Sequence, residues 1–360
     1  MSVAVQAPAG TGGGTSSPAA PAPPAHHART ATLRGLGLLV GLGVLAVVAL
    51  ASIWLGTRDI SFLGTWTVLW HPDGSHDAVI IHDYRIPRTL LGLLVGVSLG
   101  LSGALMQALT RNPLADPGLL GVNLGASTGV VVAIAFLGVG TILGYVWFAF
   151  AGAAVASLVV YLLGSSGRGM ATPERLVLAG AALTAVLYAF NTAVLLVNPG
   201  AFNEFRFWTV GALAGRYLNV VLAILPFVLV GAVIAVALAR PLNVLAMGDQ
   251  VGRALGARVG RTRALGAVAV MMLCGAATAA CGPIGFIGLA VPHVARFVVG
   301  PDQRWVLPYS MVLAPILLLG ADILGRVLGA PGEVQVGIVT AFLGAPVFIA
   351  LCRRRKLVAL

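Results

Sequence analysis

The sequence predicts an all-α polytopic membrane protein that crosses the bilayer about ten times. Two observations support this fold class. The 360 residues are 59% hydrophobic and only 9% charged, whereas a soluble domain carries about 25% charged residues. The apolar runs reach about 20 residues, the length of a spanning helix, and lack the strict alternation of barrel strands. Because backbone polar groups cannot stay unpaired in lipid, such runs must form helices.

The N-terminal segment differs from the rest of the chain. Residues 1–32 are rich in Ala, Pro, Gly, Ser and Thr and show no hydrophobic periodicity. This composition predicts a disordered tail. The segment lacks the compact basic start and short apolar core of a cleaved signal peptide. We therefore expect the membrane domain to occupy residues 33–356, with its first span retained.

Ten apolar segments follow in order, each with the composition of a membrane span. The eighth is short and starts at Gly282-Pro283, which indicates a broken or tilted beginning. The predicted spans are 34–56, 88–110, 118–138, 142–163, 173–197, 217–239, 262–281, 284–299, 304–327 and 335–352.

The basic residues test this order, because cytoplasmic loops are enriched in Lys and Arg. With the N-terminus in the cytoplasm, all but six of the 22 Lys and Arg residues fall on the cytoplasmic side. Both termini are then cytoplasmic, the largest outer loop is 57–87 and the largest cytoplasmic loop is 240–261. The net charge of +11 is spread over these loops, so we expect contact with anionic lipid and no nucleic-acid partner.

The source of energy is constrained by what the chain lacks. A phosphate-binding loop of the G-x-x-x-x-G-K-[ST] type needs a lysine, and the only lysine, Lys356, follows no such loop. Ion-coupled transporters place acids inside spans, but the one clear example is Asp322, and Arg326 four residues later can pair with it. These observations favour a non-enzymatic permease driven by another polypeptide. An ion-coupled secondary transporter is the alternative from another class.

Two polar regions have open interpretations. The loop between Pro241 and Gly256 has apolar residues at helical spacing, which predicts two short helices with a turn at Gly248. They could lie on lipid or dock in a groove of a cytoplasmic partner. On the outer side, Arg85 and Arg88 could anchor the interface or bind carboxylates. The histidines and aspartates of loop 57–87 match no standard metal spacing, so we expect no metal site.

Several motifs, in this order, resemble one known family. They are Arg85-Ile-Pro-Arg-Thr-Leu90, Ser102-Gly-Ala-Leu-Met-Gln107, Arg111-Asn-Pro-Leu-Ala-Asp-Pro-Gly118, Gly282-Pro-Ile-Gly-Phe-Ile-Gly288, Val291-Pro-His293 and Gly344-Ala-Pro346. Over residues 33–356 the chain resembles the FecCD-type permeases of ABC importers for iron-siderophores, haem and cobalamin. The resemblance implies a type II importer permease with an inverted repeat. A weak echo between Arg88-Thr89 and Arg261-Thr262, which would start on opposite sides, fits such a repeat.

The resemblance also implies partners and a location. A second permease subunit, identical or similar, would pair with this chain in the lipid of a bacterial cytoplasmic (inner) membrane. An ABC ATPase dimer would bind on the cytoplasmic side and use the ATP, so no cofactor is expected on this chain. A substrate-binding lipoprotein or periplasmic protein would dock outside. An iron-siderophore is the expected cargo, because residues 111–127 look most like siderophore permeases, and haem or cobalamin is the alternative.

Finally, the resemblance assigns roles to individual residues. Arg85, Arg88 and Arg326 would receive carboxylates of the binding protein, and Thr172, Pro173 and Glu174 would form a cytoplasmic gate. The residues expected to couple to the ATPase are Leu242, Asn243, Leu245, Met247, Gly248, Asp249, Gln250, Arg253, Leu255 and Gly256.

Overall fold

The computed structural model describes residues 26–58, 60–71, 73–165 and 173–353, and the regular elements in these ranges are all helical. The predicted all-α fold class is therefore confirmed. Within these described ranges, seven helices are long and apolar enough to cross a membrane. They are α1 (His26–Trp54), α4 (Ile86–Thr110), α6 (Ile142–Ser165), α7 (Pro173–Val197), α9 (Leu218–Ala237), α12 (Val259–Cys281) and α14 (Gln303–Leu328).

The other three predicted spans correspond to shorter apolar helices. They are α5 (Val122–Leu137), α13 (Ile287–Val299) and α15 (Val336–Arg353). Each predicted span thus contains a helix, but length and composition support only seven crossings, and ten stays a prediction. The short eighth segment begins as the sequence suggested. The chain between α12 and α13 leaves the helical conformation at Gly282 and Phe286, which have positive φ angles of 78° and 68°.

The boundary of the predicted N-terminal tail is wrong at its C-terminal end. Helix α1 begins at His26, inside the 1–32 segment that composition assigned to disorder. The physical reason is local. The last proline of the segment is Pro24, and no Gly or Pro interrupts the chain from there to Gly35. Without a helix-breaking residue, the apolar helix extends back by nearly two turns.

The segment predicted as the outer loop, 57–87, is largely helical in its described residues. It contains α2 (Phe62–Trp70), α3 (His76–Val79) and a π-helical turn, η1 (Ile80–Arg85), that runs directly into α4. Pro87 does not break this path because it lies in the first turn of α4, where its missing N–H is not needed. A small separate core holds the segment together, formed by Ile60, Val68, Ala78 and Ile81.

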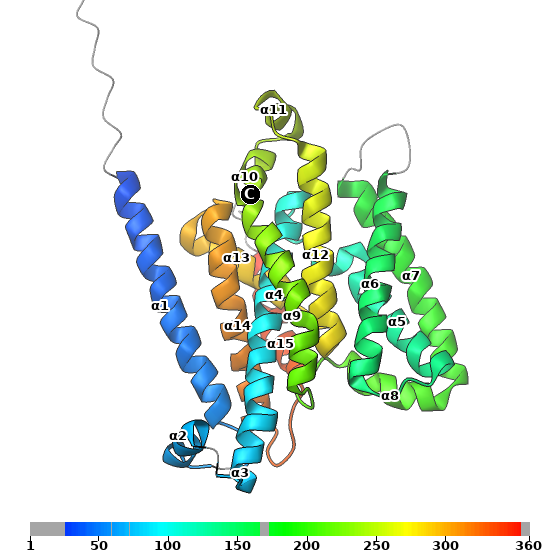
Figure 1. The fold of residues 1–360 in the computed structure, drawn as a ribbon. Helices are drawn as coiled ribbons and strands as arrows, with labels where there is room; N and C mark the ends of the chain where they lie inside the picture. Colours follow the sequence, from blue (N-terminus) through cyan, green and yellow to red (C-terminus); the bar gives the residue numbers. More distant parts are fainter. Residues whose placement is uncertain (1–25, 59, 72, 166–172, 354–360) are drawn as a thin grey trace, which may run out of the picture.

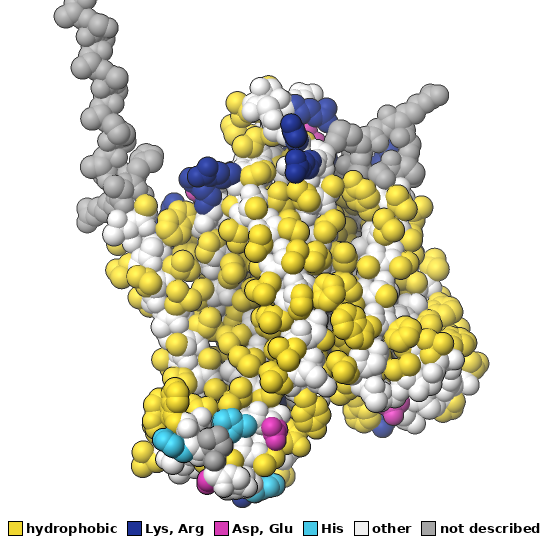
Figure 2. All heavy atoms as spheres, viewed as in Figure 1, with side chains coloured by type: hydrophobic (Ala, Val, Ile, Leu, Met, Phe, Trp, Pro, Cys, Tyr) yellow, Lys and Arg dark blue, Asp and Glu magenta, His cyan; other side chains and the backbone are white. Residues whose placement is uncertain are grey.

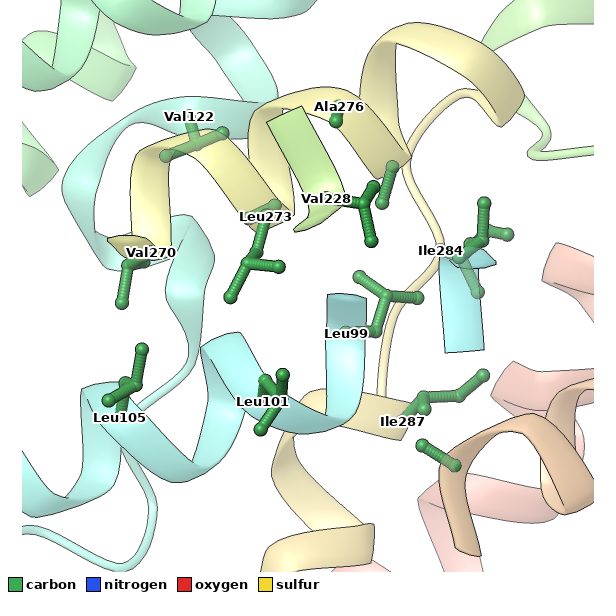
Figure 3. Packing of buried hydrophobic residues seen from close by; sticks show 14 of the residues in the cluster. Leu99, Leu101, Leu105, Val122, Val228, Val270, Leu273, Ala276, Ile284 and Ile287 are labelled. Carbon is green, nitrogen blue, oxygen red and sulfur yellow. The ribbon is translucent and has the colours of Figure 1, made fainter. Parts of the chain in front are cut away.

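Helix α4 is the centre of the fold. It packs against α9, α12, α13 and α14, and most of its residues are buried. Figure 3 shows side chains from α4, α5, α9, α12 and α13 gathered in one cluster. Glycines let the backbones approach: a Cβ at Gly103 would overlap the carbonyl group of Gly288 in the first turn of α13. Such small-residue contacts replace the hydrophobic effect, which does not draw helices together within lipid.

The two ends of the molecule differ in chemistry. Helices α2, α3 and α8 (Pro199–Thr209) lie at one end of the bundle, and α10 (Ala239–Ala246) and α11 (Asp249–Ala254) lie at the other (Figure 1). On the face drawn in Figure 2, a broad hydrophobic band separates them, with most Lys and Arg at the α11 end and the His residues at the α2–α3 end. This is the charge asymmetry expected of a membrane protein with basic cytoplasmic loops.

Candidate functional site

The segment 242–256 forms the two short helices that the sequence predicted. Helix α10 ends at Ala246 and α11 begins at Asp249, with the turn at Gly248 between them. Gly248 has a φ angle of +106°, a conformation that residues with a Cβ rarely adopt. Helix α11 projects from the bundle beyond the ends of the long helices (Figure 1).

One face of α10 is fixed to the membrane domain. Leu242 and Leu245 are fully buried. The side chain of Asn243 donates to a carboxylate oxygen of Asp302 at 2.6 Å and accepts from the backbone N–H of Gln303 at 2.8 Å. Asp302 is in turn the N-cap of α14. A force applied to α10 is therefore transmitted directly to the first turn of α14.

Helix α11 is attached through its first residue. The carboxylate of Asp249 pairs with Arg263 on α12 at 3.0 Å and with Arg111 at the C-terminal end of α4. An acidic side chain in a first turn also interacts favourably with the helix dipole. The second helix of the pair is thus tied by charge to the ends of two long helices.

The outward face of this helix pair is apolar. Met247, Val251 and Leu255 are 61%, 44% and 63% exposed, and Gln250 and Arg253 are exposed beside them. We call these five residues the projecting surface. Because α11 stands away from the hydrophobic band (Figures 1 and 2), the projecting surface fits a protein partner better than a lipid surface.

The opposite end of the molecule holds a cluster of buried charges. Arg88 donates to both carboxylate oxygens of Asp322, at 2.8 and 2.9 Å, and to Glu333 at 2.8 Å. Arg326 pairs with Asp322 at 3.1 Å, so the ion pair expected from their spacing is confirmed. Asp322 is only 1% exposed. Its charge is compensated by two guanidinium groups, which a buried carboxylate requires.

Further contacts of Arg326 and Arg85 hold the end of α1. Arg326 donates to the carbonyl groups of Ser52 and Leu55 at 2.8 and 2.7 Å. Arg85 donates to Ile53 at 3.1 Å and also to the carbonyl of Trp54. The last carbonyls of a helix have no partner within it, so the guanidinium groups act as a C-terminal cap for α1.

These contacts decide how much of each arginine is accessible. Arg85 and Arg326 are buried, whereas the side chains of Arg88 and Glu333 keep 13% and 27% exposure. The structure brings the three predicted docking arginines together in one cluster. Their role toward a binding protein is untested and stays a prediction, in which Arg88 is the most accessible of the three.

Sequence reasoning missed a polar link between α4 and α13. The Gln107 side chain donates to the carbonyl of Leu289 at 3.1 Å and accepts from Arg296. Arg296 lies in the last turn of α13 and is only 1% exposed. The partners are more than 180 residues apart, and no local signal connects them.

The predicted gate is only partly within the described residues. Thr172 lies outside them, and Pro173 and Glu174 are the first residues of α7. Within the described part of the chain, no group of three His, Cys, Asp or Glu side chains is placed to hold a metal ion.

One titratable group near the projecting helices has a clearly shifted pKa. The hydrogen bond from Arg304, aided by the one from Asn243, lowers the pKa of Asp302 to about 2 from an ordinary value of 3.8. The carboxylate that links α10 to α14 is therefore ionised throughout the physiological range.

Comparison with known proteins places these features in context. The sequence model of the FecCD transport family matches residues 44–354. The ferric enterobactin transport system permease protein FepD of Escherichia coli K12 is 48% identical over 316 residues, which cover 88% of this chain and 94% of that protein. The probable siderophore transport system permease protein YfiZ of Bacillus subtilis is 41% identical, covering 91% and 98%.

A solved structure shares the fold. It is an inward-facing conformation of a metal-chelate type ABC transporter, with a TM-score of 0.77 and 26% identity over 88% of this chain and 98% of that one. Nearly the whole helical bundle is therefore common to both molecules.

Proposed function

The chain belongs to the FecCD transport family, and from that premise we propose that it is the permease subunit of an ATP-binding-cassette importer for an iron-siderophore complex. It is a multi-pass protein of the inner membrane, in a family whose members work with ATPase and substrate-binding partners. The observation that carries the proposal is the projecting pair α10–α11. An apolar surface held rigidly beyond the membrane band suits the reception of force from a separate ATPase.

The cargo is assigned through the relatives. FepD and YfiZ are named for ferric enterobactin and siderophore transport, and both match along almost their full length. Uptake of iron-labelled siderophores into iron-limited cells, with and without the chain, tests the assignment. Loss of siderophore uptake is expected. Loss of haem or cobalamin uptake instead would leave the proposed importer permease in place and change the assigned cargo.

The partner on the projecting surface is proposed to be an ATPase dimer, which binds and uses the ATP. Met247→Asp and Leu255→Asp place charge on exposed apolar positions without disturbing buried ones. Each variant is expected to lose the ATPase on co-purification. The matched control is Leu63→Asp on α2, which is 75% exposed at the other end of the molecule. Full ATPase recovery with both α10–α11 variants would contradict the proposal.

The charge cluster argues against the ion-coupled alternative. A proton relay needs an acid that can be protonated and released. Asp322 instead receives hydrogen bonds from Arg88 and lies beside Arg326, buried between the two cations. This arrangement supports a structural role for the one intramembrane acid noted in the sequence, and it favours energy supplied by ATP.

At the outer end we propose that Arg88, with Arg85 and Arg326 behind it, receives a carboxylate of the substrate-binding protein. Arg88→Gln combined with Glu333→Gln removes one charge of each sign and keeps the pair between Asp322 and Arg326. Binding-protein affinity for this double variant in nanodiscs should fall. The control is Arg206→Gln on α8, an arginine of the same end that stacks on Phe207. Unchanged affinity of the binding protein for the double variant would contradict the docking role.

A further inference from the structure

A second basic feature lies beside the projecting helices. A groove of about 490 Å³ opens between the end of α9, helix α10 and the beginning of α12. Three arginines line it, Arg240, Arg258 and Arg261, and all three are exposed. Its volume is in the range of small-ligand pockets, about 300–1,000 Å³.

The charge of this groove is uncompensated among the described residues. No acidic residue lines it, and none of the described ion pairs involves its three arginines. The nearby carboxylate of Asp249 is already engaged by Arg111 and Arg263. Guanidinium groups suit phosphate, because their planar donors bind two oxygens at once. The groove therefore presents a site of the right charge and chemistry for a phosphate group.

Apart from its three arginines, the groove is lined mostly by apolar residues. Ala237, Leu238 and Leu265 line it from α9, the link to α10, and α12. One turn before Ala237 on α9, Val233 is 69% exposed. A ligand in this position meets cations at one end and hydrocarbon at the other.

We propose that this groove binds the phosphate headgroup of an anionic phospholipid, whose acyl chains lie along α9 and α12. Basic pockets between spanning helices at the cytoplasmic interface attract such headgroups. A bound lipid would brace the beginning of α12 and the link to α11 against the bilayer. The inference goes beyond the transport function and does not depend on the cargo.

The test measures lipid binding to the full-length permease in detergent. Phosphatidylglycerol and phosphatidylcholine are titrated separately, with binding followed by native mass spectrometry. The wild-type protein should prefer phosphatidylglycerol. Each arginine near an anionic headgroup contributes about fivefold in affinity, so Arg258→Gln plus Arg261→Gln should weaken phosphatidylglycerol binding about 25-fold and leave phosphatidylcholine unchanged.

Two further variants distinguish lipid binding in the groove from attraction by the overall positive charge of the protein. Arg34→Gln plus Arg175→Gln removes the same charge from α1 and α7, outside the groove lining, and should change binding less than about twofold, because screening weakens distant charges. Ala237→Trp fills the apolar part of the groove without changing any charge and should weaken binding as much as the arginine pair. Thermal unfolding of every variant establishes that it is folded.

Several results would overturn the proposal. Equal loss in both arginine pairs would show that only the overall field attracts lipid. Unimpaired lipid binding in Ala237→Trp would show that the acyl chains do not lie in the apolar part of the groove. Displacement of phosphatidylglycerol by inorganic phosphate would make the site one for free anions. Normal lipid binding with loss of ATPase co-purification in the Arg258 and Arg261 variant would assign the groove to the ATPase instead.

Discussion

Asp322 illustrates how single residues stabilise this molecule. Its carboxylate is 1% exposed and is held by Arg88 and Arg326. The same arginines reach the carbonyl end of α1 and the side chain of Glu333. One buried acid therefore coordinates charges from two long helices, and those charges in turn connect to a third helix and to the loop that follows α14.

Removing this charge should be costly. Asp322→Asn leaves the buried guanidinium group of Arg326 without its carboxylate and leaves Arg88 paired only with Glu333. Breaking a buried pair typically costs about 3–5 kcal/mol. The free energy of unfolding in detergent should fall by that amount. Arg58→Gln is the control, since its pair with Asp77 is exposed and such pairs contribute about 0–1 kcal/mol. Equal losses in the two variants would show that the buried cluster stabilises the protein no more than an exposed ion pair does.

Because Asp302 is an ionised N-cap, we expect its contribution to the free energy of unfolding to depend on pH. Its pKa is lowered to about 2 in the folded protein, so its contribution is fully present above the ordinary value of 3.8 and is lost as pH falls through about 2. Asp302→Ala removes an N-cap and should cost about 1 kcal/mol at pH 7. The difference in unfolding free energy between variant and wild type should shrink below pH 4.

A cap that cannot titrate provides the comparison for Asp302. Ser61 is the N-cap of α2 and accepts from the N–H of Gly64 at 3.0 Å. The cost of Ser61→Ala should not vary with pH. A pH-independent cost for Asp302→Ala as well would contradict the ionised cap.

At the scale of elements, close backbone contact decides which helices are neighbours. On α4, Gly96, Gly100 and Gly103 face backbone atoms of α14 and of the first turn of α13. Between α5 and α6, Gly125 and Gly152 face each other's carbonyl groups. These glycines are therefore contact points at which the helices pack closely.

A side chain at one of these points should separate the helices. Gly103→Leu would collide with the backbone at Gly288 and should cost about 3 kcal/mol or more, the upper range for overpacking. Gly43→Leu on α1 is the matched control, since nothing lies within 4 Å of a Cβ there. Thermal unfolding of both variants measures the difference. Similar midpoints would mean that the α4 contact is loose.

At the scale of the whole molecule, the two ends predict an orientation in the membrane. We propose that the α11 end faces the cytoplasm, as the distribution of Arg and Lys indicates. In a cysteine-free background, His76→Cys should react with a membrane-impermeant maleimide in intact cells. Gln250→Cys should react only after permeabilisation. The reverse pattern would invert the orientation and reassign both functional ends.

The sequence by itself determined the helical elements of this protein. Helix formation in lipid depends on apolar length and on the absence of breaking residues, both of which are local. For the same reason it determined the turn at Gly248 and the pair of Asp322 with Arg326, which are four residues apart. The start of α1 was predicted too late, because the prediction used the composition of residues 1–32 and not the position of the last proline, Pro24.

Only the tertiary structure decided which of these elements meet. Arg88 and Asp322 are 234 residues apart, and Arg85 caps a helix that ended before it in the sequence. Seen from the sequence, both arginines suggested exposed anchors or docking points. In lipid every helix is apolar on most faces, so no periodic pattern marks the buried side. Which helices pack together therefore depends on glycine contacts and buried charges, whose geometry exists only in the folded molecule.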